Sequence, residues 1–497
     1  MRLGNGRPMQ LHDLLRQFDS TLTLTGLPDL PVAGVKDDSR LVRPGDLFVA
    51  RGGTQTDGAQ FAADAVANGA VAIVTQSRLP GLSIPQIILP NTASAVSILA
   101  HHIHGNPTEQ VKTLAVTGTN GKTTTTYILR HLVTQTNDRC GMIGTVEIDD
   151  GQSRRPATMT TPGACELAEL FASMRDQGCL RCAIEVSSHA LDQDRVAGMH
   201  FAGAGFTNLT GDHLDYHKTM EHYAAAKAKL FSSLDENAVA AVNAASDWST
   251  WMERKCKARV VRFGIGSGTG VDYQARDVSI QAGGSSFVLV TPDGRAEVNL
   301  AMIGRHNVEN ALLAAALAGE VFGMSVHQIA AGLKTATGAP GRLQSVQAGQ
   351  PFSVLVDYAH TDDALENVLS ALRPLTQGKL RVLFGCGGDR DASKRPRMAR
   401  IAERLADVVY LTSDNPRREE PESILDMIAA GFSGTMGKPV FREIDRRAAI
   451  AQALQDAEAG DVVLLAGKGH ENYQIIGTEK RHFDDVEEAT RVLASKV

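Results

Sequence analysis

The chain has 497 residues, of which 43% are hydrophobic and 21% charged, and its formal net charge is −6. At about 150 residues per domain this length predicts about three domains. The composition is ordinary for a folded globular protein, which excludes disorder and collagen-like repeats. The acidic balance and the lack of a long Lys/Arg block argue against a general nucleic-acid binder, which needs a concentrated basic surface. A small anionic ligand held by a few local charges remains compatible with these numbers.

The sequence carries no sign of a membrane span or of secretion. The longest apolar run near a helix covers residues 311–319 and is cut by Glu320, far short of the ~20 residues that cross a bilayer. The N-terminus has no apolar signal-peptide core. Cys179 and Cys182 have the spacing of a metal or redox pair, but without a second pair we interpret them as small buried hydrophobic residues. We therefore expect a cytoplasmic protein with neither a nucleic-acid partner nor membrane insertion.

Two breaks that contain Gly and Pro divide the chain. Gly105-Asn106-Pro107 ends a predicted helix over residues 92–104, and Gly338-Ala339-Pro340-Gly341 precedes a predicted strand over residues 352–357. They predict three domains, which cover residues 1–107, 108–338 and 339–497.

Within these segments short apolar runs alternate with helical stretches, which predicts an α/β protein. In the first segment we expect strands over 42–51, 70–75 and 86–89 and helices over 61–68 and 92–104. In the second we expect strands over 113–117, 182–187, 205–209, 238–242 and 260–263 and helices over 122–134, 165–177, 220–232 and 308–321. In the third we expect strands over 352–357, 380–384, 408–412 and 462–466. The alternation predicts a parallel sheet whose ligands lie beyond the carboxyl ends of its strands, in the loops 358–360, 385–391, 413–417 and 467–471.

The strongest single motif is Gly118-Thr119-Asn120-Gly121-Lys122-Thr123-Thr124, which follows a predicted strand and opens a predicted helix. Backbone amides of a Gly-rich loop and of a helix N-terminus can surround phosphate oxygens. Lys122 can neutralise the outer phosphates, and the hydroxyl of Thr123 can ligate Mg²⁺. The motif departs from the full phosphate-loop pattern, because Val116 stands where that pattern has its first Gly. The alternative is an ordinary turn that happens to contain Gly-Lys-Thr.

Two further polar segments follow predicted strands of the middle segment. Glu185 stands at the end of one strand, and Asp212-His213-Leu214-Asp215 follows the next. Mg²⁺ takes hard oxygen ligands, usually one or two from the protein besides phosphate, so Glu185 is a candidate ligand. A capping or ion-paired carboxylate is the alternative for Glu185, and a structural histidine is the alternative for His213.

Several motifs occur together in one order along the chain. They are Gly118 to Thr124, Glu185 to His189, Asp212 to Asp215, Gly304-Arg305-His306-Asn307-Val308-Glu309-Asn310 and Asp357-Tyr358-Ala359-His360. In this order they resemble the Mur ligase superfamily of ATP-dependent amide-forming enzymes. The resemblance spans nearly the whole chain and implies an α/β fold of three domains: an N-terminal uridine-nucleotide-binding domain, a central P-loop ATPase-like domain with a mostly parallel sheet, and a C-terminal Rossmann-like domain.

Within the superfamily the chain is similar to the members that add the third residue of the peptidoglycan stem peptide. Asp38-Ser39-Arg40 and residues 44–50 resemble their uridine-nucleotide segment, and Asp414-Asn415-Pro416-Arg417 resembles the signature of members that add meso-diaminopimelate rather than lysine. A guanidinium at Arg417 can hold the distal carboxylate of diaminopimelate with two parallel charge-assisted hydrogen bonds. Without the resemblance, a type I turn with Arg417 in solvent would be the simpler interpretation.

The resemblance also implies a reaction. The D-glutamate carboxylate of UDP-N-acetylmuramoyl-L-alanyl-D-glutamate attacks the γ-phosphate of ATP, and the amine of diaminopimelate then displaces phosphate from the acyl phosphate. Such phosphoryl transfer depends mostly on positioning and charge stabilisation. The implied cofactors are ATP as co-substrate, two Mg²⁺ ions and a CO₂-derived carbamate on Lys227. A lysine on the helix surface is the alternative for Lys227.

The resemblance assigns roles to the following residues. Catalytic roles fall on Lys122, Glu185, His213 and Lys227, and metal ligation on Thr123, Glu185, His213 and carboxylated Lys227. ATP contacts fall on Gly118, Thr119, Asn120, Gly121, Lys122, Thr123, Thr124, His306, Asn307, Asn310, Arg342 and Asp357. Contacts to the muramoyl peptide fall on Ser39, Thr54, Gln55, Thr56, Thr160, Thr161, Ser187, Gln193 and Arg195. Contacts to diaminopimelate fall on Arg390, Asp414, Asn415, Pro416, Arg417, Gly467 and Glu471.

Three rival interpretations stay open. A lysine-adding ligase of the same branch would differ in its acceptor. A folylpolyglutamate synthase-like ligase shares the phosphate loop, but the uridine segment and Asp414 to Arg417 argue against it. A nucleotide-regulated binding protein would hold ATP without releasing phosphate in response to an amino acid. The chain departs from the family pattern at Thr361-Asp362-Asp363, with Asp where many relatives carry Pro, and at Thr210-Gly211, which replaces a Ser-Arg pair. We expect a monomer that acts on small molecules.

Overall fold

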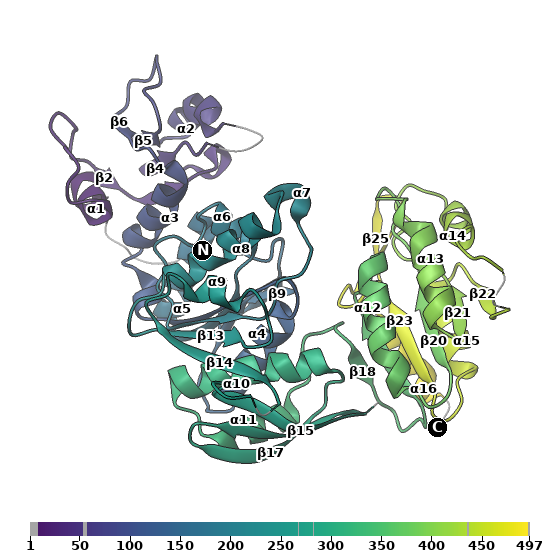
Figure 1. Cartoon of the computed structure of the whole chain (residues 1–497). Coiled ribbons are helices and arrows are strands. Elements are labelled where there is room, and N and C mark those ends of the chain that lie inside the picture. Colours follow the sequence, from purple (N-terminus) through teal and green to yellow (C-terminus); the bar gives the residue numbers. More distant parts are fainter. Residues whose placement is uncertain (1–7, 53–56, 267, 282, 435–436, 496–497) are drawn as a thin grey trace. The chain divides into compact units, whose positions relative to one another are not determined.

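The computed structural model describes residues 8–52, 57–266, 268–281, 283–434 and 437–495 of the chain (Figure 1). They form two compact units. The first holds residues 1–274 with 291–293 and 309–329, and the second holds residues 275–290 with 294–308 and 330–497. No helix in the described ranges combines the length and hydrophobicity that a membrane span needs.

The N-terminal part of the first unit is built on a four-stranded parallel sheet in the order β3-β4-β5-β6. Its strands are β3 (Gly34–Lys36), β4 (Asp46–Val49), β5 (Ala72–Thr75) and β6 (Gln86–Ile88), preceded by a short ladder of β1 (Met9–Gln10) with β2 (Pro31–Val32). Its helices are α1 (Leu11–Phe18), α2 (Ala62–Ala67) and α3 (Thr92–Ile103). The start of α3 falls where the sequence predicts it, because the Asn91 side chain accepts hydrogen bonds from the N–H groups of Ala93 and Ser94.

The central sheet of the first unit contains the strands that the motifs predict. Its order is β10-β9-β8-β11-β7-β12-β13-β14. The strands are β7 (Lys112–Thr117), β8 (Gly141–Ile143), β9 (Glu147–Asp149), β10 (Arg154–Pro156), β11 (Arg181–Glu185), β12 (Gly203–Phe206), β13 (Val239–Asn243) and β14 (Arg259–Ile265). All neighbours from β8 to β14 run parallel, and β9 and β10 add an antiparallel hairpin at the edge.

Helices cover this sheet and bury its strands. They are α4 (Lys122–Thr134), α5 (Ala164–Asp176), α6 (Ser188–Asp192), α7 (Leu214–His217), α8 (Met220–Ser232) and α9 (Ser249–Glu253). Phe171 of α5, Phe231 of α8 and Phe206 of β12 share one buried cluster. Every strand residue from 182 to 185 is buried, as continuous apolar runs in a parallel sheet predict.

The sequence analysis did not predict a run of three long strands, β15 (Tyr273–Gln281), β16 (Gly284–Thr291) and β17 (Gly294–Leu300). Along β16 buried and half-buried residues alternate, as in a strand with one covered face. The helices α10 (Arg305–Phe322) and α11 (Val326–Thr335) follow, and α10 contains the predicted helix over residues 308–321.

The C-terminal sheet has the order β18-β19-β23-β20-β21-β22, and only β18 runs antiparallel to its neighbour. Its strands are β18 (Gln344–Val346), β19 (Ser353–Asp357), β20 (Leu380–Phe384), β21 (Val408–Leu411), β22 (Val440–Arg442) and β23 (Val462–Ala466), followed by the hairpin of β24 (Tyr473–Ile476) with β25 (Glu479–His482). The helices are α12 (Asp362–Leu372), α13 (Lys394–Leu405), α14 (Pro421–Ala429), α15 (Arg446–Gln455) and α16 (Asp485–Ala494).

Alternate residues of these strands enter two separate cores. Val382 and Phe384 of β20 lie with α12, α13 and α14, whereas Leu383 lies with α15 and α16. Both faces of the sheet are therefore covered, and the predicted α/β class is confirmed. The loops at the carboxyl ends of β19, β20, β21 and β23 meet at one edge, where the sequence predicts a ligand.

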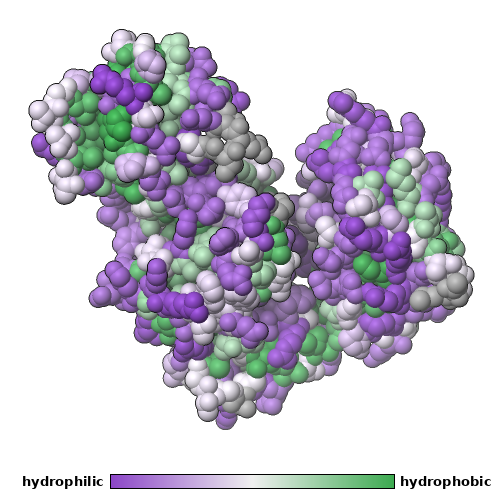
Figure 2. All heavy atoms as spheres, turned by 45° about the horizontal axis from the view of Figure 1, so that its top comes forward, coloured by the Kyte–Doolittle hydropathy of each residue, from purple (hydrophilic) through white to green (hydrophobic). Residues whose placement is uncertain are grey.

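On the face shown in Figure 2 most residues are hydrophilic, and apolar residues form patches between them. Exposed large apolar side chains include Leu41, Ile88 and Leu180 in the first unit and Val440 and Phe441 on the edge strand β22. Isolated apolar residues are ordinary on protein surfaces.

Candidate functional site

The predicted phosphate loop lies between β7 and α4. Gly118 (φ +149°) and Gly121 (φ +86°) adopt positive φ. A Cβ at Gly118 would lie 1.8 Å from the Thr207 hydroxyl oxygen, and one at Gly121 would lie 2.3 Å from Asn310 Oδ1. Both positions therefore require glycine. Lys122 Nζ donates to the carbonyl oxygens of Gly118 (2.9 Å) and Thr119 (2.8 Å), so the ammonium lies against the loop.

Glu185 ends β11 and is 1% exposed. The Thr123 hydroxyl donates to its Oε2 at 2.9 Å. Thr145 donates its backbone N–H to Oε1 at 2.8 Å and its hydroxyl to Oε2 at 3.1 Å. The structure thus brings the two predicted Mg²⁺ ligands together beside the phosphate loop. Thr145 could not be predicted from the sequence, because it belongs to no recognisable motif.

Lys227 is 1% exposed on the inner side of α8. Its Nζ donates to the carbonyl oxygen of Gly118 at 2.9 Å and lies 4.4 Å from the ring centre of Tyr223. Burial, followed by the nearby positive charge of Lys122, holds the pKa of Lys227 well below its ordinary value. The alternative of a helix-surface lysine is therefore wrong.

His213 lies on the loop before α7 in the left-handed region (φ +55°). Its Nε2 is 3.5 Å from Asp212 Oδ2, and 46% of its side chain is exposed. Its ring meets the rings of His189 (5.1 Å) and Tyr223 (6.1 Å) edge to face. The contact with Tyr223 places His213 on the same side of the loop as Lys227.

The donor set fits Mg²⁺ held mainly by phosphate. No cluster of three or more His, Cys, Asp or Glu side chains that could hold a metal occurs in the part of the chain that the structure describes. Mg²⁺ usually takes only one or two protein ligands and completes its shell with water and phosphate oxygens. The Thr123 hydroxyl and the Glu185 carboxylate supply that number.

The residues predicted to contact the muramoyl peptide gather next to Glu185. The Thr161 hydroxyl donates to the Glu185 carbonyl at 2.8 Å and accepts from the Ser187 N–H at 3.0 Å. Arg195 Nη1 donates to the Thr161 carbonyl at 2.9 Å, and its Nη2 donates to Gln193 Oε1 at 2.7 Å. A further contact joins the hydroxyls of Thr160 and Thr145 at 3.1 Å.

The remaining predicted contacts of this substrate lie in the N-terminal part. Ser39 is buried, and its carbonyl accepts a hydrogen bond from Asn68 Nδ2 at 2.9 Å. Thr54, Gln55 and Thr56 lie outside the described residues.

Of the predicted ATP contacts on α10, Asn310 lies beside the phosphate loop. Its Oδ1 accepts a hydrogen bond from the Thr125 hydroxyl at 3.4 Å. His306 and Asn307 belong to the second unit, where Asn307 Nδ2 donates to the Ile303 carbonyl at 2.9 Å. This bond at the start of α10 agrees with a helix-terminal role for Asn307.

Asp357 organises the loop after β19. Its Oδ2 accepts from the Leu343 N–H at 2.7 Å and its Oδ1 from the Ala359 N–H at 2.9 Å. Burial raises its pKa above the ordinary value. The Arg342 guanidinium lies 5.2 Å from the ring centre of Tyr358, so both predicted ATP contacts of the C-terminal part lie on one loop pair.

Two predicted arginines flank Gly387 at the carboxyl edge of the C-terminal sheet. A Cβ at Gly387 would lie 2.8 Å from Arg417 Nη1 and 3.8 Å from Arg390 Cγ. Arg417 has a φ of +53°, and its Nη1 donates to the Gly388 carbonyl at 2.8 Å. Its backbone bonds to Ile475 and Gly477 of the hairpin. Arg417 is thus half-buried and held in place, and the alternative of a turn with this arginine in solvent is wrong.

The predicted carboxylates lie beside these arginines. Asp414 is 6% exposed, and a Cβ at Gly467 (φ +110°) would lie 3.2 Å from its Oδ2. Asn415 Nδ2 donates to Glu471 Oε2 at 2.8 Å. A Cβ at Gly388 would lie 1.9 Å from the Pro416 carbonyl oxygen, which fixes the two loops against each other. The structure therefore brings all the predicted diaminopimelate contacts to one edge, and it adds Lys468, which the sequence analysis missed.

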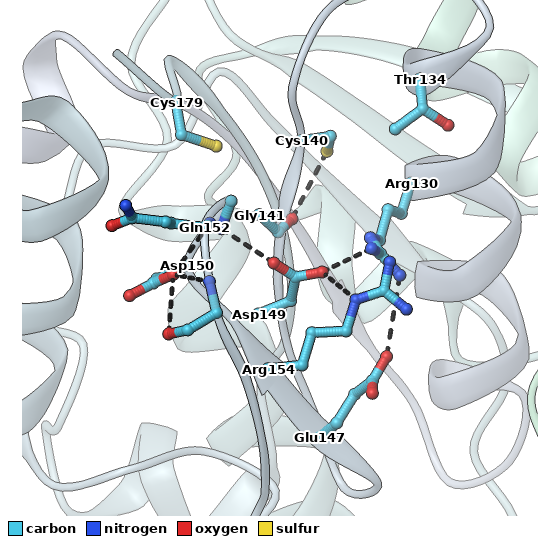
Figure 3. A network of polar contacts seen from close by, with 12 residues as sticks. Arg130, Thr134, Cys140, Gly141, Glu147, Asp149, Asp150, Gln152, Arg154 and Cys179 are labelled. Carbon is cyan, nitrogen blue, oxygen red and sulfur yellow. Dashed lines mark hydrogen bonds and ion pairs between the residues drawn. The ribbon is translucent and has the colours of Figure 1, made fainter. Parts of the chain in front are cut away.

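A network of ion pairs anchors α4, the helix that begins at the phosphate loop (Figure 3). Asp149 of β9 is 4% exposed, forms an ion pair with Arg130 of α4 and accepts from Arg154 Nε of β10 at 2.8 Å. Cys140 and Cys179 lie nearby. Cys179 and Cys182 are both buried and free, as their interpretation as small buried residues predicts.

The phosphate loop, its buried carboxylate and lysines, and the α/β architecture define a nucleotide-dependent enzyme. Family models match the chain in three stretches: the Mur ligase family catalytic domain at residues 31–103, the Mur ligase middle domain at residues 116–318, and the Mur ligase glutamate ligase domain at residues 341–469. The chain belongs to the Mur ligase family and is an ATP-dependent ligase.

Relatives of high similarity cover nearly all of the chain. It is 44% identical over 492 residues to the UDP-N-acetylmuramoyl-L-alanyl-D-glutamate–2,6-diaminopimelate ligase of Gloeobacter violaceus, a match that covers 98% of this chain and 99% of that protein. It is 45% identical over 466 residues to the ligase of the same name from Geobacillus kaustophilus, covering 93% and 94%. A solved structure of a ligase with this name is 33% identical, has a TM-score of 0.75 and covers 98% of this chain and 99% of its own.

Proposed function

We propose that this chain joins meso-diaminopimelate to UDP-N-acetylmuramoyl-L-alanyl-D-glutamate at the expense of ATP, as a step of peptidoglycan precursor synthesis. The observation that carries the proposal is the group of Arg390, Arg417, Asp414 and Glu471 at one sheet edge. The relatives that bear this activity in their names match the chain over almost its whole length.

The charges at this edge suit diaminopimelate, which carries two carboxylates and two amines. Arginine fits a carboxylate with two parallel hydrogen bonds, and carboxylates fit an ammonium group. Lysine lacks the distal carboxylate, so a bound lysine would leave an arginine of the site unpaired. A site built for a polar group rejects analogues that lack it by several orders of magnitude.

The phosphate loop would activate the D-glutamate carboxylate of the muramoyl peptide. A carboxylate is a poor acylating agent until its oxygen becomes part of a phosphate leaving group. Lys122 and the loop amides bind and orient the triphosphate. Thr123 and Glu185 would hold one Mg²⁺ and His213 would contribute to a second, and the ions would supply positive charge to the phosphates. The group of Thr160, Thr161, Ser187 and Arg195 next to Glu185 would position the carboxylate to be activated.

Lys227 is proposed to carry a carbamate. The neutral amine is the form that reacts with CO₂, and the low pKa of Lys227 favours that form. The product is an anion, which would lie beside Lys122 without the repulsion that an ammonium meets there.

We further propose a cytoplasmic monomer with three domains, at residues 1–107, 108–338 and 339–497. Sedimentation of the purified chain tests the monomer, and limited proteolysis near residues 107 and 338 tests the boundaries.

Phosphate release with ATP, Mg²⁺ and the UDP-muramoyl dipeptide tests the function, measured without an amino acid, with meso-diaminopimelate and with L-lysine. We expect release to depend on diaminopimelate and to respond weakly to lysine. Phosphate release at the same rate with and without an amino acid would contradict the proposal. Equal or better use of lysine would assign the chain to the lysine-adding branch.

A further inference from the structure

Lys468 is a fully buried lysine in the loop after β23, with no exposed side-chain area. Lysine is almost never fully buried unless it is paired, because an isolated ammonium loses its hydration without compensation. The mechanism proposed above does not use it. The groups that surround its ammonium therefore indicate the function of this buried charge.

Those partners are the residues of the amino-acid site. Lys468 Nζ lies 3.6 Å from Asp414 Oδ1 and 3.6 Å from Glu471 Oε2. It also donates a long hydrogen bond, 3.4 Å, to Asn415 Oδ1. The ring centre of Tyr473 lies 5.7 Å away. One buried cation thus faces three of the predicted diaminopimelate contacts.

Asp414 and Glu471 depend on this cation. Within the described residues Asp414 Oδ1 has no hydrogen-bond partner, and Lys468 is the only cation that forms an ion pair with either carboxylate. The Lys468 ammonium therefore balances the charge of these two carboxylates.

Arg446 is a second buried cation whose charge also acts on Asp414 and Glu471, but its ion pair is with Asp485. Its guanidinium binds Asp485 through Nε at 2.8 Å and Nη2 at 2.6 Å, and both side chains are fully buried. Nη2 also donates to the carbonyl of Ala466 at 3.0 Å, two residues before Lys468. This pair holds the end of β23 in place and leaves Lys468 as the balancing charge of the site.

We propose that Lys468 is a positioning residue that sets the charge of the amino-acid site. Its ammonium pairs with the carboxylates of Asp414 and Glu471 and orients Asn415, which in turn holds Glu471. Asp414, Glu471 and Lys468 together leave one net negative charge, which suits one ammonium group of the incoming diamine, whereas Arg390 and Arg417 suit its carboxylates. This inference rests on the proposed function of the same site.

The test compares Lys468→Met and Lys468→Arg with Lys480→Met. Lys480 is a matched control, because its Nζ lies 3.7 Å from the centre of the same Tyr473 ring, on the exposed strand β25. In the phosphate-release assay we expect Lys468→Met to raise KM for meso-diaminopimelate by about 30-fold or more. KM for ATP should not change. Lys468→Arg should restore part of the affinity, and Lys480→Met should behave like the unsubstituted chain.

The division of the effect between KM and kcat separates this role from a purely structural one. In Lys468→Met KM for diaminopimelate should rise while kcat at saturating diaminopimelate stays close to that of the unsubstituted chain, because only the binding of the amino acid loses its charge partner. An unchanged KM for diaminopimelate would overturn the proposal, and so would a loss confined to kcat.

Thermal unfolding verifies the fold of each variant. If Lys468→Met does not fold, the same kinetic result is expected of Lys468→Gln. If neither variant folds, Lys468 has a structural role and the proposal is overturned. Absence of diaminopimelate-dependent release in the unsubstituted chain would instead reject the proposed function itself, so the two failures are distinguishable.

Discussion

Lys227 is buried next to a second lysine. Both ammonium groups donate to the Gly118 carbonyl, Lys122 at 2.9 Å and Lys227 at 2.9 Å. Two like charges at one carbonyl disfavour the charged form of the more buried group. A carbamate on Lys227 would turn this repulsion into attraction and add oxygen atoms beside the phosphate loop.

Replacement of Lys227 by alanine should therefore reduce ligase activity by about 100-fold or more, and a small anion such as chloride or formate should restore part of it by filling the vacated space. Activity is measured as diaminopimelate-dependent phosphate release. Lys229→Ala is the control, since Lys229 lies on the exposed side of the same helix. Full activity of Lys227→Ala would contradict the proposed carbamate on Lys227.

His101 makes stability depend on pH. It is fully buried on α3 against Phe171, and neither ring nitrogen has a hydrogen-bond partner among the described residues. Burial, with smaller effects of His104 and His102, lowers the pKa of His101 from 6.5 to about 3. As pH falls below 6.5 the unfolded chain takes up this proton and the folded chain does not. The free energy of unfolding should then fall by at most about 1.4 kcal/mol per pH unit from this residue.

Urea unfolding at a series of pH values checks this expectation. His101→Leu should lose the contribution, so the free energy of unfolding should depend less steeply on pH below 6.5 than in the unsubstituted chain. The exposed His327 serves as control through His327→Gln. Equal slopes for His101→Leu and the unsubstituted chain would contradict the assignment.

At the scale of elements, α4 is held at both ends. It starts at the phosphate loop, and Arg130 on its last turns forms an ion pair with Asp149 of the edge hairpin (Figure 3). Asp149 Oδ1 also accepts the Gly151 N–H at 2.8 Å. The hairpin therefore fixes the direction of the helix whose first turn is proposed to bind phosphate.

Asp149→Ala should lower the free energy of unfolding by about 1–3 kcal/mol, because it leaves the largely buried Arg130 without its main partner. Arg154→Ala removes only an exposed partner of Asp149 and should cost less than about 1 kcal/mol. Chemical denaturation of the two variants gives both values. An equal loss in the two would show that Asp149 does not anchor α4.

Elements with local signals could be predicted from the sequence, and elements defined by distant partners could not. The Gly-rich loop fixes the start of α4 at Lys122, and an apolar run fixes β20 at Leu380–Phe384, as predicted. The hairpin of β9 and β10 was missed, because its strands are short and β10 is fully exposed, so no apolar alternation marks it.

The same distinction holds within the sites. Motif spacing identifies Thr123 and Glu185, but Thr145 reaches Glu185 from 40 residues away in sequence, and only the fold brings them together. Lys468 stands between two predicted contacts, Gly467 and Glu471. Only its burial shows that Lys468 is paired with the carboxylates of the site, and burial of a lysine cannot be predicted from a loop sequence.

The whole chain combines a site for activating an acid with a site for binding an amino acid. The first unit carries a phosphate loop with a buried carboxylate and lysine, and the second carries arginines and carboxylates that suit a diamino acid. In the proposed reaction an acyl phosphate links them, since it would be made at the first site and consumed by the amine held at the second.

Oxygen transfer tests this link most directly. The D-glutamate carboxylate of the UDP-muramoyl dipeptide is labelled with ¹⁸O, the chain is given ATP, Mg²⁺ and meso-diaminopimelate, and the released phosphate is analysed by mass spectrometry. We expect each phosphate to contain one oxygen from that carboxylate, because the bond that breaks joins the acyl carbon to the phosphate-bridging oxygen. Phosphate that carries no label while the amide forms would contradict the account.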